Sequence, residues 1–319
     1  MSAGDLVRSL PKIVFVLGKG GVGRSTVAAA LGSRLASAGA RTLVFGWATM
    51  DPISPWFGKP AAGLKPQAVA PNLSVANYRL EDTLELYFVE HLRLPRLYRR
   101  VIEGDHIRRL IAASPGLAEV FFIGHLWWLT TLAKEEAGID LDHVVVDAPA
   151  TGHGASLFDL PEALSLVARA GLLRVETERV TGMMADPRWT GALVVTLPEE
   201  LSAEETAELV PRVSHRLGRK PIAAIVNRSV AGMDLVADEP AAWLEEVPSG
   251  LRDSLASVRA ELVNRLGYET ALRALLDGTM EHGVLTLRDQ LACSGTHAPR
   301  DVIRAVGDEL VAAMTDRRP

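Results

Sequence analysis

The sequence predicts an α/β fold in which helices cover both faces of a doubly wound, mostly parallel sheet. Three observations favour it: several short runs are almost continuously apolar and rich in β-branched residues, helical patterns separate these runs, and a glycine-rich turn follows the first run. Continuous rather than alternating apolar runs are typical of strands that are buried on both faces. Their alternation with helices indicates the α/β class.

Five runs have the composition of buried strands. They are KIVFVL, RTLVFG, HVVVDA, ALVVTL and IAAIVN, at residues 12–17, 41–46, 143–148, 192–197 and 222–227. A weaker strand is expected over residues 283–289.

Two helices are predicted between these strands. Residues 25–39 have helical spacing and end at Gly39, a residue suited to a helix C-terminus. Residues 202–218 start with Ser202 and Glu205, which have the spacing of a capping box and therefore predict a helix beginning at Ser202.

The remaining long intervals are also helical in pattern. Residues 79–140 contain no strand-like run and predict a helical insertion on the sheet. Residues 229–319 are expected to be mostly helical and to end in an amphipathic helix over 301–315. We expect a single domain over residues 1–319.

Composition excludes several classes of protein. The net charge of −5 gives no support for a nucleic-acid partner. The single cysteine, Cys293, forms neither a disulfide framework nor a zinc clamp, which fits the reducing cytoplasm. The apolar stretch 120–133 is shorter than the ~20 residues that a membrane-spanning helix needs. The apolar run at 13–18 is too short for a signal peptide. We therefore expect a soluble cytoplasmic protein without an integral membrane segment.

The stretch GKGGVGRS at residues 18–25, here called the glycine loop, fits the phosphate-binding pattern G-x-x-x-x-G-K-[ST] except that Arg24 replaces the lysine. It follows a predicted strand and precedes a predicted helix, the context in which backbone N–H groups cradle phosphates. Four glycines within six residues disfavour the alternative of an ordinary turn. The expected ATP ligands are Gly18, Lys19, Gly20, Gly21, Val22, Gly23, Arg24, Ser25 and Thr26, and the Ser25 hydroxyl is expected to ligate Mg²⁺.

A lysine, Lys19, directly follows the first glycine. The loop GKGGVG thereby resembles the deviant Walker A loop of partition ATPases, Min ATPases, the nitrogenase iron protein, and the arsenite-pump and tail-anchored-protein-targeting ATPases. The resemblance implies a nucleotide-gated dimer in which Lys19 reaches the phosphates bound to the partner subunit. Charge supplied in trans in this way is worth ~10³–10⁵ in rate.

Residues 143–154, HVVVDAPATGHG, select one branch of that group. Asp147 ends a predicted strand, where an acidic residue can hold the Mg²⁺ shell. From Asp147 to Thr151, Gly152 and His153 the sequence resembles the D-x-x-x-T-G-H switch of the arsenite-pump and tail-anchor-targeting ATPase family. Alone it reads as a strand and a turn, but together with the glycine loop it indicates the switch.

Further segments resemble this family in the same order. Residues 47–58 resemble its first switch, and the Asp-Pro pair Asp51-Pro52 assigns to Asp51 the task of orienting or deprotonating the attacking water. The alternative is an ordinary turn aspartate before proline. Asn227 matches the asparagine that reads the adenine edge. The resemblance covers about residues 12–228 and implies ATP, Mg²⁺ and ATP hydrolysis.

The sequence departs from the family at the lysine position. Arginine is a longer, planar fork where lysine is a compact point charge, so Arg24 keeps the charge and changes the fit. We assign the catalytic roles to Lys19, Asp51 and Arg24 and expect slow or partner-dependent hydrolysis. The alternative is a non-catalytic ATP-binding subunit that pairs with a lysine-bearing paralogue. The partner is thus a second copy in a homodimer or a paralogous ATPase in a heterodimer. The cysteines that the family uses for zinc and for metalloids are absent, which disfavours arsenite-stimulated pumping.

Targeting members of the family bind a hydrophobic client helix in a groove lined by such a helical insertion. This insertion has eight large apolar residues, which would form a client surface if exposed. The alternative that we favour is that they form the core of the helical layer. They are Leu84, Leu86, Tyr87, Phe88, Phe121, Phe122, Trp127 and Trp128.

Overall fold

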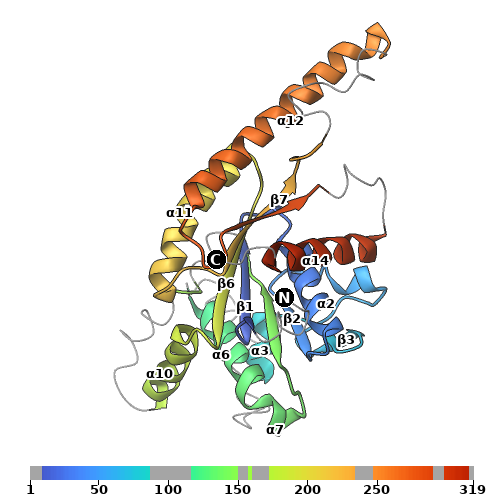
Figure 1. Cartoon of the computed structure of the whole chain (residues 1–319). Coiled ribbons are helices and arrows are strands. Elements are labelled where there is room, and N and C mark those ends of the chain that lie inside the picture. Colours follow the sequence, from blue (N-terminus) through green and yellow to red (C-terminus); the bar gives the residue numbers. More distant parts are fainter. Residues whose placement is uncertain are drawn as a thin grey trace, which may run out of the picture.

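A computed structural model describes residues 9–86, 116–149, 157–159, 172–233, 247–289 and 298–315. Its centre is one eight-stranded sheet with the order β3-β4-β2-β5-β1-β6-β7-β8, in which every neighbouring pair is parallel except β3 with β4 (Figure 1). The strands are β1 Ile13–Gly18, β2 Thr42–Gly46, β3 Gln67–Ala70, β4 Leu73–Asn77, β5 His143–Asp147, β6 Thr190–Thr196, β7 Ala223–Ser229 and β8 Val284–Arg288.

Helices connect the strands and cover the sheet. They are α2 Arg24–Ser37, η1 Ser54–Phe57 (a 3₁₀ turn), α3 Leu80–Leu86, α6 Leu117–Thr131, α7 Ala133–Ala137, α10 Leu172–Ala185, α11 Glu200–Leu217, α12 Ser249–Leu276 and α14 Pro299–Thr315. This architecture confirms the predicted doubly wound, mostly parallel α/β fold.

The six predicted strands are present within two residues of their expected bounds. The strands β3 and β4 were not predicted, because they are short and lie at the edge of the sheet. The signal that could have found them is the Pro71-Asn72 turn between two short apolar runs. Asn72 adopts a left-handed backbone with φ 57°, as a tight hairpin requires.

Helix ends were predicted with mixed success. At the end of α2, Gly39 has φ 95° and donates its N–H to Ala36, while Ala40 donates to Leu35, which is the C-terminal motif expected of this glycine. The capping-box prediction is wrong: α11 starts at Glu200 without a side-chain cap, and Ser202 is buried inside it. The Ser202 carbonyl accepts hydrogen bonds from two threonine side chains, Thr196 and Thr206, which fix it against the end of β6.

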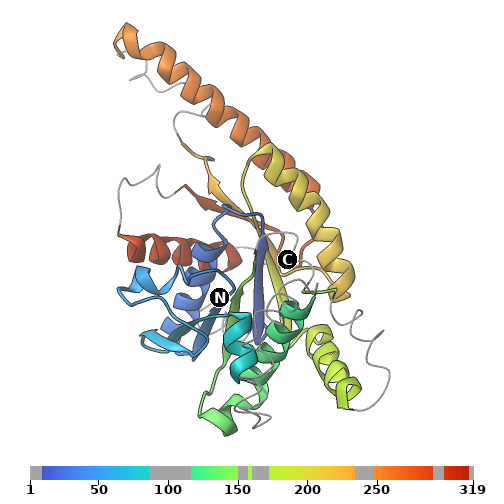
Figure 2. The same ribbon diagram turned by 180° about the vertical axis from the view of Figure 1, so that it is seen from behind.

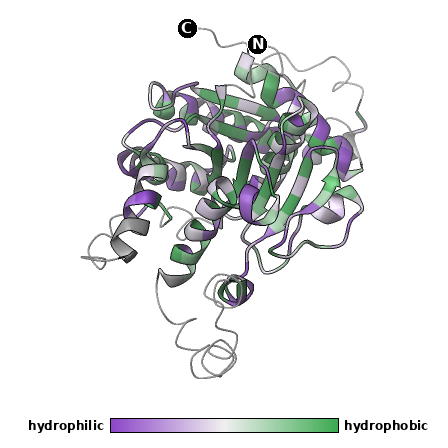
Figure 3. Ribbon diagram, turned by 90° about the horizontal axis from the view of Figure 1, so that it is seen from below, coloured by the Kyte–Doolittle hydropathy of each residue, from purple (hydrophilic) through white to green (hydrophobic). Residues whose placement is uncertain are grey.

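The two faces of the sheet carry separate cores. In β1, Ile13, Phe15 and Leu17 face a cluster with α6, α10, α11 and α12. Val14 and Val16 face the opposite cluster, which contains α2 and α14. Because successive strand residues point to opposite faces, coverage of both faces requires an uninterrupted apolar run. Figure 3 shows the hydrophobic residues concentrated on the central strands.

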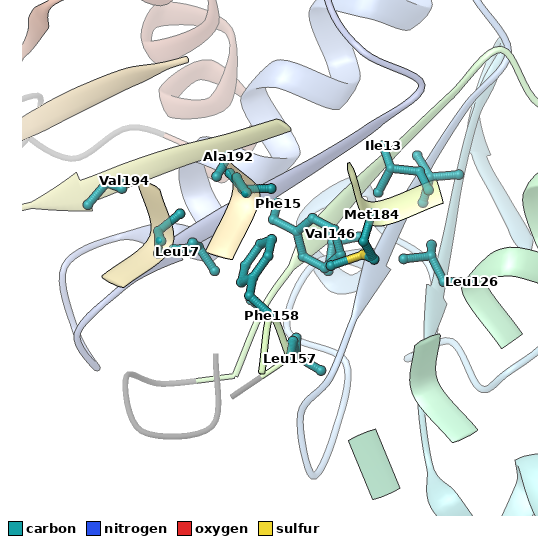
Figure 4. Close-up of a cluster of buried hydrophobic side chains, with 14 of the residues drawn as sticks. Ile13, Phe15, Leu17, Leu126, Val146, Leu157, Phe158, Met184, Ala192 and Val194 are labelled. Carbon is teal, nitrogen blue, oxygen red and sulfur yellow. The ribbon is translucent and has the colours of Figure 1, made fainter. Parts of the chain in front are cut away.

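A close-up of the first cluster shows how the strands and the distant Phe158 meet (Figure 4). The rings of Phe15 and Phe158 pack edge to face with their centroids 5.0 Å apart. Leu157 and Phe158 are both buried, so these two residues, which follow the predicted switch in the sequence, are anchored in this core.

The described part of the predicted insertion is helical, with α3, α6 and α7. Leu84 and Phe122 are buried. Four further apolar residues are partly buried and pack against the same core: Leu86, Phe121, Trp127 and Trp128. In the single chain these side chains therefore serve the core. Two others, Tyr87 and Phe88, lie outside the described residues.

Helix α12 extends well beyond the sheet (Figures 1 and 2). Its C-terminal part buries Leu272 and Leu276, whereas Leu251 and Val258 near its other end are exposed. Within the described ranges, no helix combines the length and apolarity needed to cross a membrane.

Phe45 on β2 is a test of the first core. Its ring stacks on Phe122 at 5.1 Å, is buried completely, and has Tyr78 at its edge. We predict that Phe45→Ala lowers the free energy of unfolding by about 3–5 kcal/mol, because it removes a fully buried ring and leaves a cavity. Urea unfolding followed by circular dichroism measures the change. The control Leu275→Ala, at an exposed position on α12, is expected to change it by less than about 0.5 kcal/mol.

Candidate nucleotide site

The residues predicted for the site gather at the carboxyl edge of the parallel strands. In the sheet register Asp147 of β5 pairs with Val16 of β1 on one side and with Gly46 of β2 on the other. The chain continues from β1 toward β2 through α2, and from β5 toward β6 on the far side of β1. Strands β1 and β5 thus form the switch point at which α/β sheets bind ligands.

The glycine loop joins β1 to α2 at this edge. Gly21 and Gly23 have φ values of 87° and 95°, in the left-handed region that favours glycine. A Cβ atom on Gly18 would overlap the backbone carbonyl of Val195. Helix α2 starts at Arg24, and its N-cap residue Gly23 offers no side-chain acceptor to the N–H groups of the first turn, which suit an anion.

Ser25 and Asp147 meet where the loop enters α2. The Ser25 hydroxyl donates to Oδ2 of Asp147 at 2.6 Å. Burial raises the pKa of Asp147, whereas the Ser25 hydrogen bond and the charge of Arg24 lower it, and the charge of Asp51 raises it. A hydroxyl and a carboxylate are the oxygen ligands that Mg²⁺ takes beside phosphates. These two side chains therefore fit the expected metal.

Arg24, in the lysine position, points toward the start of the second switch. Its Nη1 donates to the carbonyl oxygen of Ala148, the residue after Asp147. Burial lowers the pKa of Arg24, and the nearby Asp147 carboxylate opposes that effect. Arg24 thus connects the first turn of α2 to the chain that leads into the predicted switch. Thr151, Gly152 and His153 of that switch lie outside the described residues.

Lys19, the second residue of the glycine loop, contacts helix α11. Its Nζ forms an ion pair with Oε1 of Glu205 on α11 at 3.2 Å, and both side chains are partly exposed. The sequence interpretation assigned Glu205 to a helix cap and missed this contact.

Asp51 is buried and accepts hydrogen bonds from three backbone N–H groups. These belong to Ile53 at 2.8 Å, Ser54 at 3.2 Å and Ala62 at 2.8 Å. The carboxylate therefore holds residues 51–62, including Pro52, in one conformation. Its negative charge is one of the influences that raise the pKa of Asp147. The water-orienting role of Asp51 stays a prediction.

Asn227, near the end of β7, contacts the glycine loop. Its Nδ2 donates to the carbonyl of Val22 at 2.9 Å, and its Oδ1 accepts from the N–H of Arg228 at 2.9 Å. The predicted contact of Asn227 with adenine remains a prediction. In the described part of the chain, no group of three or more His, Cys, Asp or Glu residues could hold a metal by itself.

Comparison with known proteins connects this geometry to a family. Residues 11–175, about half of the chain, match the family of anion-transporting ATPases. The chain is 30% identical over 228 residues to ATPase BagA of Mycobacterium tuberculosis, an alignment that covers 69% of this chain and 65% of that protein. It is 30% identical over 237 residues to an arsenical pump-driving ATPase of Acidiphilium multivorum, covering 72% and 37%.

A third relative aligns over more of the chain. An arsenical pump-driving ATPase of Escherichia coli is 23% identical over 304 residues, which are 88% of this chain and 51% of that protein. The chain spans less than two thirds of the length of these relatives. The matched range includes the glycine loop, Asp51 and Asp147, so the chain belongs to the anion-transporting ATPase family.

Proposed function

We propose that this chain binds ATP and Mg²⁺ and acts as a nucleotide-gated dimeric ATPase whose hydrolysis is slow or depends on a partner. The observation that supports this most directly is the hydrogen bond between Ser25 and Asp147 at the end of the glycine loop, in a chain of this family. It brings the two expected metal ligands together from elements that are far apart in the sequence.

The glycine loop would hold the phosphate chain through backbone N–H groups and the start of α2. Ser25 and Asp147 would hold Mg²⁺, which neutralises the charge of the phosphates. Arg24 would add a fixed positive charge from the first turn of α2. Its longer, planar head group reaches the Ala148 carbonyl, so its fit to the phosphates differs from that of lysine.

Lys19 would act on the phosphates of the partner subunit. In the single chain it pairs with Glu205, and both side chains are partly exposed. An exposed ion pair of this kind is worth about 0–1 kcal/mol, so little free energy is needed to turn Lys19 toward a triphosphate across a dimer. The partner would be a second copy or a paralogous ATPase.

A second candidate function is that of a non-catalytic, ATP-binding subunit in a heterodimer. It is favoured by Arg24 itself, because the guanidinium is engaged with a protein carbonyl in the place where the family has a lysine. A lysine-bearing paralogue would then supply hydrolysis.

We propose that the protein is cytoplasmic, which fits its single cysteine. By its resemblance to the targeting ATPases, a hydrophobic protein is the class of client to test. The names of the Acidiphilium and Escherichia relatives describe the driving of an arsenical pump. Arsenite-stimulated pumping is disfavoured for the present chain, because its single cysteine, Cys293, cannot form the set of cysteines that the family uses for metalloids.

Replacement of Arg24 distinguishes the two functions. We predict that Arg24→Lys increases the rate of single-turnover ATP hydrolysis by up to ~10²-fold. The reason is that displacing a charged group by about 1 Å from its best position can reduce the rate by that factor. Quenched-flow measurement on the purified chain gives both rates. The control is Arg304→Lys on α14, because the Arg304 side chain is exposed and its ion pair, with Asp301, stays within the same helix. The non-catalytic subunit would be supported if the wild type and Arg24→Lys each show no hydrolysis alone and a lysine-bearing paralogue hydrolyses ATP at the same rate with either of them.

Action in trans is tested by mixing two inactive variants. Lys19→Ala should bind ATP without hydrolysing it, and Ser25→Ala should be unable to hold the metal while keeping Lys19. If Lys19 serves the partner's site, a mixture regains part of the wild-type rate, because the mixed dimer has one complete site. Two affinity tags verify that mixed dimers form. Mixed dimers without recovered activity would contradict this role of Lys19.

Asp51 has a structural task that can be measured apart from catalysis. Asp51→Asn replaces one acceptor oxygen by an NH₂ group, which cannot accept a hydrogen bond from the backbone N–H that faces it. A buried N–H donor left without an acceptor costs about 1–3 kcal/mol. We predict that the amides of Ile53, Ser54 and Ala62 exchange hydrogen at least about tenfold faster in this variant. Asp253→Asn, at an exposed position on α12, should leave them unchanged. Unaltered exchange in Asp51→Asn would show that the carboxylate does not hold this segment.

A further inference from the structure

Asn227 joins the end of β7 directly to the glycine loop, across 205 residues of sequence. Its Nδ2 donates to the Val22 carbonyl, and its Oδ1 accepts from the N–H of Arg228. These two contacts fix the orientation of the amide, because an Oδ1 turned toward the Val22 carbonyl would have no hydrogen to share.

The amide also lies against the backbone of Gly23. A Cβ atom at that residue would overlap Nδ2 of Asn227, and Gly23 has the left-handed φ of 95°. Gly23 directly precedes Arg24, the first residue of α2. Asn227 therefore contacts the turn that sets the orientation of the last loop residues and of the first N–H groups of α2.

The residue after Asn227 is itself held in place. Arg228 adopts a left-handed backbone with φ 56°, which is uncommon for a residue with a side chain. Its carbonyl accepts a hydrogen bond from Nη2 of Arg265 on α12 at 2.5 Å. This support from a neighbouring helix limits the freedom of the backbone that carries Asn227, as expected of a residue that positions a site.

We propose that Asn227 is a positioning residue that holds Val22 and Gly23 in the conformation that binds the phosphate chain. A carboxamide has two donor hydrogens and two acceptor lone pairs, and these contacts use one of each. A contact with the base is compatible with this role. The loop contact, however, should affect the affinity for any ligand that carries the same phosphates. The identity of that ligand rests on the proposed function.

The experiment compares the affinity of Asn227→Ala and the wild type for Mg²⁺ complexes of ATP, GTP and inorganic tripolyphosphate. We expect Asn227→Ala to lose affinity for all three ligands. The loss for tripolyphosphate, which has no base, should be roughly twofold to tenfold, the effect of one neutral hydrogen bond. Gly23→Ala displaces the same amide and also strains a residue with φ 95°, so it should lose at least as much affinity for all three ligands. Asn264→Ala, exposed on α12, is the matched control. A loss restricted to ATP, or no loss at all, overturns the proposal.

A second measurement needs no ligand. In the nucleotide-free chain, hydrogen exchange of the amides of residues 19–23 should be faster in Asn227→Ala and in Asn227→Ser than in the wild type. Unchanged exchange in both variants overturns the proposal. If the wild type binds none of the three ligands, the proposed function fails, whereas the exchange experiment still decides the role of Asn227.

Discussion

Parallel pairing of β1 with β5 places Asp147 beside the strand that leads into the glycine loop. A shift of this register by one residue would turn Asp147 to the opposite face of the sheet, away from Ser25. The register is maintained because both strands are buried on both faces, with Val146 packing against one group of helices and Val145 against the other. The geometry of the site therefore depends on the packing of the whole sheet.

Each buried charge of the site has a partner of opposite charge or a hydrogen-bond donor. Asp147 is buried with Arg24 near it and the Ser25 hydroxyl bonded to it, and Asp51 is surrounded by backbone donors. Such partners are required because an isolated buried carboxylate is costly. Lys19 likewise has Glu205 in the single chain. In the proposed function, a triphosphate replaces protein groups as the partner of Lys19 and Arg24, which connects ligand binding to Ala148 at the start of the second switch and to Glu205 on α11.

Helix α11 contacts both sides of this arrangement. Near its start Glu205 pairs with Lys19 of the loop. Two further residues of α11, Arg212 and Arg216, form ion pairs with Asp159 at 3.1 Å and 2.7 Å. Asp159 follows the buried Phe158, beyond the predicted second switch. A movement of α11 would therefore act both on Lys19 of the loop and on Asp159, which lies beyond the predicted switch in the sequence.

The sequence by itself determined the fold class, six of the eight strands and the glycine loop, because these are properties of short segments: continuous apolar runs, helical spacing, and glycines at left-handed positions such as Gly23. It did not reveal β3 and β4, whose edge positions need few apolar residues, nor the true start of α11, which packing of Ser202 decides. Only the tertiary structure brought Arg24 to Ala148, Lys19 to Glu205 and Asn227 to Val22. Each of these contacts joins residues more than a hundred positions apart, and a local pattern cannot specify them because their distance depends on how the strands are ordered in the sheet.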